Sequence, residues 1–250
     1  MSFLNKLGIG IGSATSRDVS RPVGANARPR TPGTPPVGGG SVPRGQESHE
    51  TARVSNGLKE LLWNLDGLGK GNLLDLGPAW QTTLSFFIER GFRVSSEDIL
   101  RGWKGFLAEE EVRLREDASA IESLDMTPGG RAIRFLNESL QYPKSSFDAV
   151  LLWDLLDYLE PTLAKQTVAS LTELLRPAGV VFAMFHSKKP EGFQRYRVAD
   201  SNTLQRISTP VICPAQKVYQ NREIQDLFGR YRTMKSFVTR DQLRETLFIK

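Results

Sequence analysis

The sequence predicts an α/β fold with a doubly wound, mostly parallel sheet of seven strands. Short apolar runs alternate with segments whose apolar residues recur at helical spacing, which indicates a parallel sheet with helices on both faces. The run over 147–153 (FDAVLLW) is apolar at every position except Asp148, as expected for a strand that is buried on both faces.

The elements can be assigned in order from Val54 onward. Leucines at helical spacing predict a helix over 58–65, and the glycines that follow it end that helix. Further helices are expected over 80–90, 101–116, 161–175 (with a proline in its first turn) and 219–228. Strands are expected over 72–76, 92–95, 131–136, 147–153, 180–185, 233–238 and 245–249. Turns are expected at 127–130 and 177–179, and a separate hairpin is expected from 196–198 and 204–207.

The first 53 residues differ in composition from the rest of the chain. Pro, Gly, Ser, Thr and Arg dominate 13–50, and such a segment cannot bury enough apolar surface to offset the entropy lost on ordering. We therefore expect a disordered Pro/Gly/Arg-rich tail over 1–53 and one folded domain over 54–250. The arginines of the tail could contact an acidic partner.

Charge is distributed unevenly. The chain has 33 Lys and Arg against 28 Asp and Glu, and residues 186–250 hold 13 basic and 6 acidic residues. This C-terminal part is expected to form a basic surface, which is either simply solvated or attracts an anionic substrate, nucleic acid or a membrane surface.

Cysteine content and apolar runs bear on the compartment. The single cysteine, Cys213, excludes an intramolecular disulfide and fits a reducing compartment. Glycines interrupt the apolar stretch at the start of the chain, and no apolar run approaches the roughly 20 residues that a membrane helix needs. We expect a cytoplasmic protein without a membrane span.

The segment over 72–98 predicts a ligand site. A strand over 72–76 is followed at once by Gly77, and the strand over 92–95 is followed by Glu97 and Asp98. A glycine at this point lets a ligand approach the backbone, and an acid about 20 residues further on can bind ribose hydroxyls. This pattern is typical of a site for an adenine nucleoside or dinucleotide.

Five stretches carry a family resemblance. They are LLDLGPAWQ, GFRVSSED, FLNESLQYPKSSFD, FDAVLLWDLLDYLEP and LLRPAGVVFAMF. In this order and spacing, residues 58–250 resemble the class I (Rossmann-like) S-adenosylmethionine-dependent methyltransferases. The resemblance implies a Rossmann-like sheet that ends in an antiparallel hairpin, and S-adenosylmethionine as the cofactor.

The resemblance also implies which residues contact the cofactor. Asp75 would lie near the ammonium group, Gly77 would leave room for the methionine part, and Asp98 would bind the ribose hydroxyls. Asn137, or its neighbour Glu138 as a one-residue alternative, would lie near the adenine, and Trp153 would face the transferred methyl group. Ala79 and Gln81 stand where the family has its second and third glycines, and Ala79 is counted as a contact. The full set of expected contacts is Asp75, Gly77, Ala79, Asp98, Asn137 and Trp153.

Each of these residues has a structural alternative. Asp98 could cap a helix, Asn137 could be a turn residue, and Trp153 could belong to the core. His186, at the end of the strand over 180–185, could act as a general base or be structural. Asp157 and Tyr158 are candidates for the acceptor side, and no metal site is expected.

Two functions follow from these expectations. The first is methyl transfer to an unidentified acceptor, which requires positioning rather than an obligatory catalytic residue, so none is assigned. Basic and aromatic residues over 186–219 could hold a phosphate-bearing or nucleic-acid acceptor. The alternative is a catalytically inactive scaffold, because two family glycines are replaced. A nicotinamide-dependent oxidoreductase is disfavoured, because it needs further glycines after Gly77 and a second mononucleotide-binding half.

Overall fold

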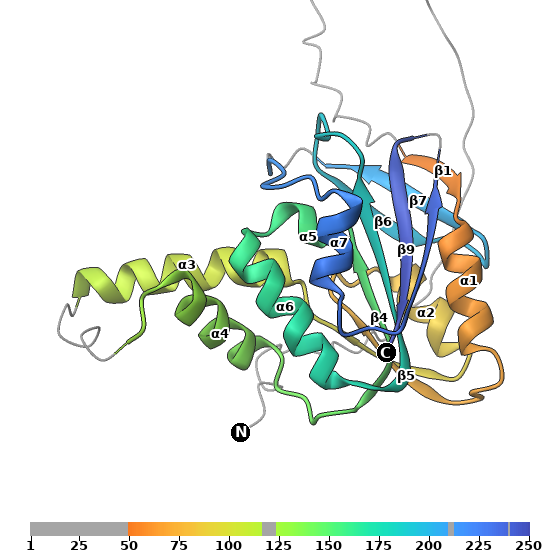
Figure 1. Cartoon of the computed structure of the whole chain (residues 1–250), viewed down its shortest axis with the longest axis horizontal. Coiled ribbons are helices and arrows are strands. Elements are labelled where there is room, and N and C mark those ends of the chain that lie inside the picture. Colours follow the sequence, from red (N-terminus) through yellow and green to blue (C-terminus); the bar gives the residue numbers. More distant parts are fainter. Residues whose placement is uncertain (1–49, 117–123, 210–212, 240) are drawn as a thin grey trace, which may run out of the picture. The chain divides into compact units, whose positions relative to one another are not determined.

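The structure is a computed structural model that describes residues 50–116, 124–209, 213–239 and 241–250. Its main sheet has six strands in the order β3-β2-β4-β5-β9-β8 (Figure 1). Their bounds are Gly71–Asp75 (β2), Phe92–Ser96 (β3), Phe147–Trp153 (β4), Leu175–His186 (β5), Thr233–Val238 (β8) and Leu243–Ile249 (β9). Strands β2, β3, β4 and β5 are parallel, whereas β9 pairs antiparallel with β5 and β8 pairs antiparallel with β9. The mostly parallel sheet and its closing hairpin are confirmed.

Helices cover both faces of this sheet (Figure 1). The helices are α1 (Asn56–Leu65), α2 (Gln81–Ile88), α3 (Ile99–Glu116), α4 (Pro128–Ser139), α5 (Leu155–Tyr158), α6 (Pro161–Leu174) and α7 (Asn221–Leu227). Leu73 and Leu74 are neighbours in β2, but their side chains lie on opposite faces of the sheet. Leu73 belongs to the part of the core formed with α1 and α2, and Leu74 to the part formed with α3, α4 and α6. The doubly wound arrangement is therefore confirmed.

A second sheet has three strands in the order β1-β7-β6, with bounds Glu50–Val54 (β1), Thr203–Ser208 (β7) and Gln194–Val198 (β6). The pairing of β6 with β7 confirms the hairpin predicted there. Strand β1 was not predicted, and it places the start of the domain at least four residues before Val54. Its residues are mostly exposed, so backbone pairing with β7 and not apolar alternation makes this segment a strand.

The strand predicted over 131–136 is wrong, and the main sheet accordingly has six strands rather than seven. This segment lies inside α4. The side chain of Thr127 accepts a hydrogen bond from the backbone N–H of Gly130 at 3.1 Å, and Pro128 occupies the first turn, so the expected turn is a helix start. Ala132, Phe135 and Leu136 are buried at the spacing of one helix face.

The turn predicted at 177–179 lies inside β5, which begins at Leu175. The register against β4 changes from Phe147 opposite Leu175 to Ala149 opposite Val180. Ala178 has φ 63°, a left-handed conformation that accommodates the irregularity within the strand.

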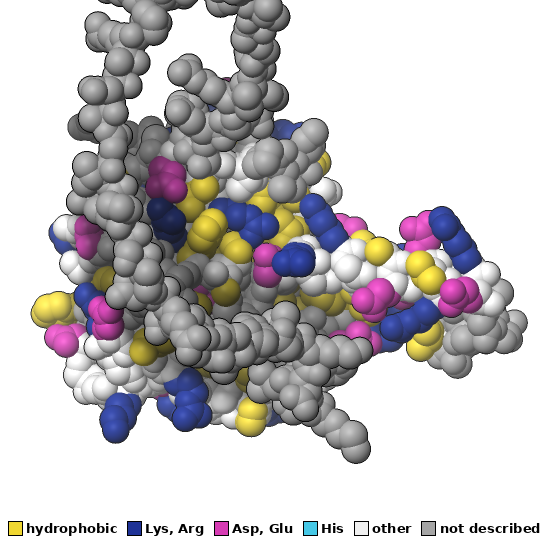
Figure 2. All heavy atoms as spheres, turned by 180° about the vertical axis from the view of Figure 1, so that it is seen from behind, with side chains coloured by type: hydrophobic (Ala, Val, Ile, Leu, Met, Phe, Trp, Pro, Cys, Tyr) yellow, Lys and Arg dark blue, Asp and Glu magenta, His cyan; other side chains and the backbone are white. Residues whose placement is uncertain are grey.

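The longest described helix is α3, with 18 residues. Figure 2 shows acidic and basic side chains intermixed along it. Ion pairs one turn apart join Arg113 to Glu109 and Arg115 to Glu111. Neither this helix nor any other in the described ranges combines the length and the apolar character that crossing a membrane requires.

Candidate functional site

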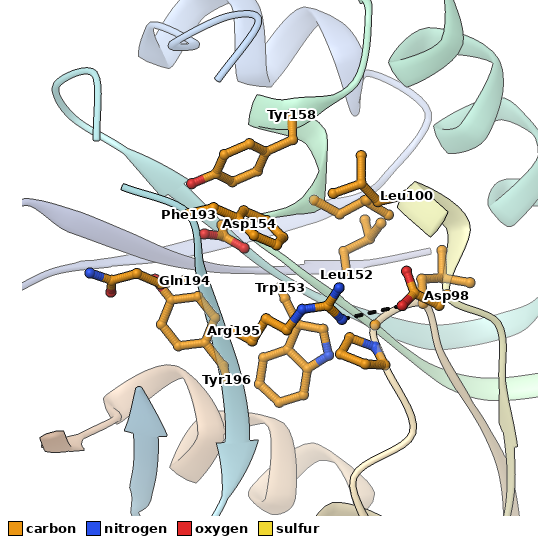
Figure 3. Close-up of a pocket in the computed structure, with 14 residues that line it drawn as sticks. Asp98, Leu100, Leu152, Trp153, Asp154, Tyr158, Phe193, Gln194, Arg195 and Tyr196 are labelled. Atoms are coloured by element: carbon orange, nitrogen blue, oxygen red, sulfur yellow. Dashed lines mark hydrogen bonds and ion pairs between the residues drawn. The ribbon is translucent and has the colours of Figure 1, made fainter. Parts of the chain in front are cut away.

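A pocket lies at the carboxyl ends of β2 and β4, beside the segment that follows β3 and against β6 (Figure 3). Three of the predicted contacts line this pocket, namely Gly77, Asp98 and Trp153. Apolar side chains, among them Leu100 and Phe193, form part of the wall. Ligands in open α/β sheets bind at the carboxyl ends of the strands, so the pocket has the expected position.

Asp75, the last residue of β2, lies next to the pocket and is fully buried. Its Oδ1 accepts hydrogen bonds from the backbone N–H of Gly77 at 2.9 Å and from the indole Nε1–H of Trp153 at 2.7 Å. Its Oδ2 has no hydrogen-bond partner among the described residues. Burial raises the pKa of Asp75 to about 6, although both hydrogen bonds act to lower it. One oxygen of this carboxyl group thus has unused bonding capacity.

The indole of Trp153 covers Gly77. A Cβ atom on Gly77 would lie 2.8 Å from Cδ1 and 2.9 Å from Nε1 of the indole, so the contact requires a glycine. Trp153 has φ 52°, in the left-handed region that bulky residues rarely adopt. Its ring is also nearly parallel to that of Tyr196 in β6, at 6.3 Å between centroids. The close approach to Gly77 predicted for a ligand is made by this side chain.

Asp98 combines a structural role with a position at the pocket. Its Oδ1 accepts a hydrogen bond from the backbone N–H of Arg101 at 3.1 Å, which caps the first turn of α3. Its Oδ2 forms an ion pair with Nη1 of Arg195 at 3.2 Å, and each side chain is about one fifth exposed. Figure 3 shows the Arg195 side chain passing beside the Trp153 indole to reach Asp98.

The volume of the pocket is small, with a cavity of about 40 Å³. Such a cavity holds a few water molecules, whereas sites for organic ligands commonly measure about 300–1,000 Å³. The donor set fits S-adenosylmethionine, since Asp98 can accept hydrogen bonds from ribose and Asp75 has an unpartnered oxygen for a cation. The space fits it only if Trp153 and Arg195 move aside.

A second group of titratable side chains lies where β4 and β5 end. The Oδ2 of Asp157 accepts hydrogen bonds from the backbone N–H of His186 at 2.7 Å and from its ring Nδ1–H at 2.9 Å. The other ring nitrogen, Nε2, lies 3.7 Å from Oδ2 of Asp154, which has no hydrogen-bond partner among the described residues. Asp154 also lines the pocket (Figure 3). The histidine thus lies between two buried carboxyl groups.

Burial and charge both act on this group. Burial, together with the nearby Asp157, raises the pKa of Asp154 to about 7, although His186 acts to lower it. Burial alone would lower the pKa of His186, but the hydrogen bond to Asp157 and the surrounding carboxylates outweigh it and raise that pKa. Burial and the carboxylates also raise the pKa of Tyr158 and of Tyr196, which therefore keep their protons.

No protein-family model matches the chain, and no curated protein matches it. Among solved structures, a Burkholderia thailandensis 1,6-didemethyltoxoflavin-N1-methyltransferase with bound S-adenosylhomocysteine is similar at 15% identity, over 78% of each chain, with a TM-score of 0.39. A methyltransferase from Methanosarcina mazei is similar at 17% identity, over 73% of this chain and 93% of its own, with a TM-score of 0.40. One from Mesorhizobium loti is similar at 11% identity, over 76% and 96%, with a TM-score of 0.40.

The Rossmann-like sheet is assigned from the structure itself. It rests on the strand order, on the parallel pairing of β3 with β2, β2 with β4 and β4 with β5, and on the helices that cover both faces.

The structure brings four of the six predicted contacts together and leaves two apart. Direct contacts link Asp75, Gly77 and Trp153 beside the pocket, and Asp98 lines the same pocket. Ala79 is exposed and does not line the pocket. Asn137 is exposed on α4, because the strand that would have carried it to the sheet edge is a helix.

The role of Arg195 was missed from sequence, where it counted only as one of several basic residues over 186–219. Its partner, Asp98, is 97 positions away in the chain. The one available signal was the period of two along β6, where Arg195 and Arg197 alternate with Gln194 and Tyr196, but it identifies no partner.

Proposed function

We propose that this domain binds S-adenosylmethionine at the pocket beside Gly77 and is a methyltransferase. One observation carries the proposal. Asp75 at the end of β2, Gly77 just after it and Asp98 after β3 lie with Trp153, the last residue of β4, at the carboxyl edge of one parallel sheet.

Each residue has a definite task in this proposal. Asp98 accepts hydrogen bonds from the ribose hydroxyls, and the unpartnered Oδ2 of Asp75 attracts the ammonium group. Leu100 and Phe193 supply apolar surface for the adenine. When bound, the cofactor supplies a methyl group on a positively charged sulfonium sulfur. The chain contributes mainly orientation and exclusion of water, and neither requires a nucleophile.

Binding requires that Trp153 and Arg195 leave their positions. The Arg195–Asp98 ion pair is partly exposed, so breaking it costs about 1 kcal/mol or less. The left-handed backbone of Trp153 is a strained conformation, of the kind that concentrates at ligand sites. Displacing Arg195 therefore has a modest free-energy cost, whereas moving the buried Trp153 indole also breaks its hydrogen bond to Asp75, and the ligand must replace that contact.

Calorimetric titration of S-adenosylmethionine and S-adenosylhomocysteine into the full chain tests the proposal. A protein that begins at Val54 is unsuitable, because it lacks most of β1. Saturable binding is expected in the wild type and in the control variant Asp66→Ala, which removes an exposed acid at the end of α1. Binding should be lost in Asp98→Ser, which removes the carboxylate but keeps an oxygen that can cap α3. Equal affinity in Asp98→Ser would contradict the assignment.

A catalytically inactive scaffold is the second candidate. It is favoured by the way that Trp153 and Arg195 fill the pocket and leave a cavity of about 40 Å³. A scaffold of this kind would bind neither ligand in the titration, although its unfolding transition would show that it is folded. Saturable binding of either ligand would exclude it.

A further inference from the structure

A second hollow opens at the end of β5, on the other side of Gln194 and Tyr196 from the pocket. We call it the polar hollow; its lining includes His186, Lys188, Lys189, Gln194, Tyr196 and Arg206. Its cavity measures about 490 Å³, which is within the range of sites for small organic ligands. Gln194 and Tyr196 line both cavities, so this hollow adjoins the proposed cofactor pocket.

The polar hollow carries an excess of positive charge. Lys188, Lys189 and Arg206 line it, and none of the three pairs with a carboxylate of the described residues within 4.0 Å. Of the acids in its lining, Asp241 is already paired with Arg53 at 3.4 Å. The remaining acid is Glu191, which is exposed. Electrostatics therefore favour an anion here.

His186 gives the polar hollow a proton acceptor. The Nδ1–H of its ring donates to Asp157 at 2.9 Å, which assigns the neutral ring the tautomer with a free lone pair on Nε2. The 3.7 Å between Nε2 and Oδ2 of Asp154 is too long for a direct hydrogen bond. Asp154 lines the pocket beside Gly77 and not the polar hollow, so His186 is the group that can accept a proton from a molecule in the hollow.

We propose that the polar hollow binds the methyl acceptor, a small anionic molecule with a hydroxyl group, and that Nε2 of His186 takes the hydroxyl proton. The O–H bond breaks, its electron pair stays on oxygen, and the proton forms a new N–H bond with the Nε2 lone pair. Lys188, Lys189 and Arg206 hold the anionic group, and Asp157 positions the imidazole ring. That the ligand is a methyl acceptor rests on the function proposed above, whereas the anion site and the histidine tautomer do not.

Several charged or titratable groups lie around His186, and the carboxylates of Asp157, Asp154 and Asp241 raise its pKa. The other groups nearby are Tyr158 in α5, Tyr196 on β6, Arg244 on β9, and Lys188 and Lys189. These carboxylates are present whether or not an anion is bound, so the effect of a bound anion on the pKa of His186 adds to theirs. An anion beside Nε2 therefore raises the pKa of His186 above its value in the free protein.

Nuclear magnetic resonance of the full chain with labelled histidines tests the anion site with inorganic phosphate as the probe. The variant His49→Gln leaves His186 as the only histidine, so its signal is assigned directly. Saturating phosphate should raise the pKa of His186 by about half a unit or more relative to sodium chloride of equal ionic strength. The shift should be lost in Lys188→Ala/Lys189→Ala and kept in Lys59→Ala/Lys104→Ala, which removes two exposed lysines elsewhere.

The outcomes separate this proposal from the cofactor assignment, because the experiment contains no S-adenosylmethionine. No change in the pKa of His186 with phosphate, or an equal change in both lysine variants, would overturn the anion site even if the cofactor binds. A phosphate shift that depends on Lys188 and Lys189 would support the site even if the cofactor titration fails.

The nitrogen chemical shifts of His186 test the roles of the histidine and of Asp157. The neutral ring of the wild type should carry its proton on Nδ1. Asp157→Asn should lower the pKa of His186 and weaken this tautomer preference, because the amide removes the negative charge that stabilises the imidazolium. A neutral ring with its proton on Nε2 in the wild type would show that this nitrogen cannot accept a proton, and would overturn the proposed role.

Discussion

At the scale of single residues, the site depends on contacts between side chains that are far apart in the chain. Asp75 and Gly77 could be placed at the pocket from sequence, because a polar residue and a glycine after a buried strand lie at the carboxyl edge of the sheet. Trp153 was placed there too, but its contact with Gly77 depends on a left-handed backbone that no local pattern predicts. The ion pair between Asp98 and Arg195 depends on how β6 lies against the sheet.

The raised pKa of Asp75 predicts how stability depends on pH. A carboxyl group whose pKa is raised from 3.8 to about 6 binds its proton more tightly in the folded state, so its ionisation destabilises the fold as pH rises through this window. Asp75→Asn removes this penalty, while the amide oxygen can still accept both hydrogen bonds. The free energy of unfolding of the variant minus that of the wild type should therefore increase by up to about 3 kcal/mol between about pH 3.5 and about pH 7.5.

Denaturant unfolding of both proteins at several pH values measures this difference. Any constant cost of the amide, such as an unpaired N–H group, cancels when the difference is followed with pH. A difference that stays the same from acid to neutral pH would mean that Asp75 is not perturbed in the folded state.

At the scale of elements, segments with strong apolar patterns were predicted correctly and segments with mixed patterns were not. The run of β4, apolar at every position except Asp148, is a strand with the predicted bounds. The segment 131–136 is short and mixed, and only the cap at Thr127 together with Pro128 distinguishes the helix from a strand after a turn. Strand β1 could not be predicted, because its exposed residues follow no apolar period and its partner β7 is about 150 residues away.

The cap of α4 can be tested directly. Thr127→Ala removes the side-chain oxygen that accepts the N–H of Gly130, and it should lower the free energy of unfolding by about 1 kcal/mol. Thr127→Ser keeps the oxygen and should change stability little. Denaturant unfolding of the three proteins measures both effects, and equal stability of all three would argue against a helix that starts here.

At the scale of the whole domain, one buried ion pair connects three elements. Nη2 of Arg53 in β1 lies 2.6 Å from Oε1 of Glu245 in β9, and Oε2 of Glu245 accepts the backbone N–H of Gly57 in α1 at 2.7 Å. Glu245 is fully buried, and burial raises its pKa against the effect of these partners. The segment just before the predicted domain boundary is therefore joined to the core of the main sheet.

Removal of Arg53 should be strongly destabilising. Arg53→Ala leaves Glu245 buried without its counter-charge, and the expected loss in free energy of unfolding is about 3–5 kcal/mol. Arg197→Ala is the matched control, because Arg197 pairs with Glu50 at the surface and should contribute about 1 kcal/mol or less.

A double variant separates the loss of the counter-charge from a general loss of packing. Arg53→Ala/Glu245→Gln should recover part of the stability, because it also removes the buried charge. Losses of similar size in Arg53→Ala and Arg197→Ala in the same unfolding measurement would show that the Arg53–Glu245 pair does not hold the two sheets together.

The central claim is that the pocket beside Gly77 is a cofactor site that Arg195 closes by pairing with Asp98. The most direct test is the affinity of S-adenosylhomocysteine for Arg195→Ala compared with the wild type, measured by calorimetry on the full chain. In Arg195→Ala, S-adenosylhomocysteine no longer has to break the ion pair with Asp98 before it binds. Its affinity should therefore increase several-fold, in line with an ion pair worth up to about 1 kcal/mol. Weaker or unchanged affinity in the variant, or no binding by either protein, would contradict this account.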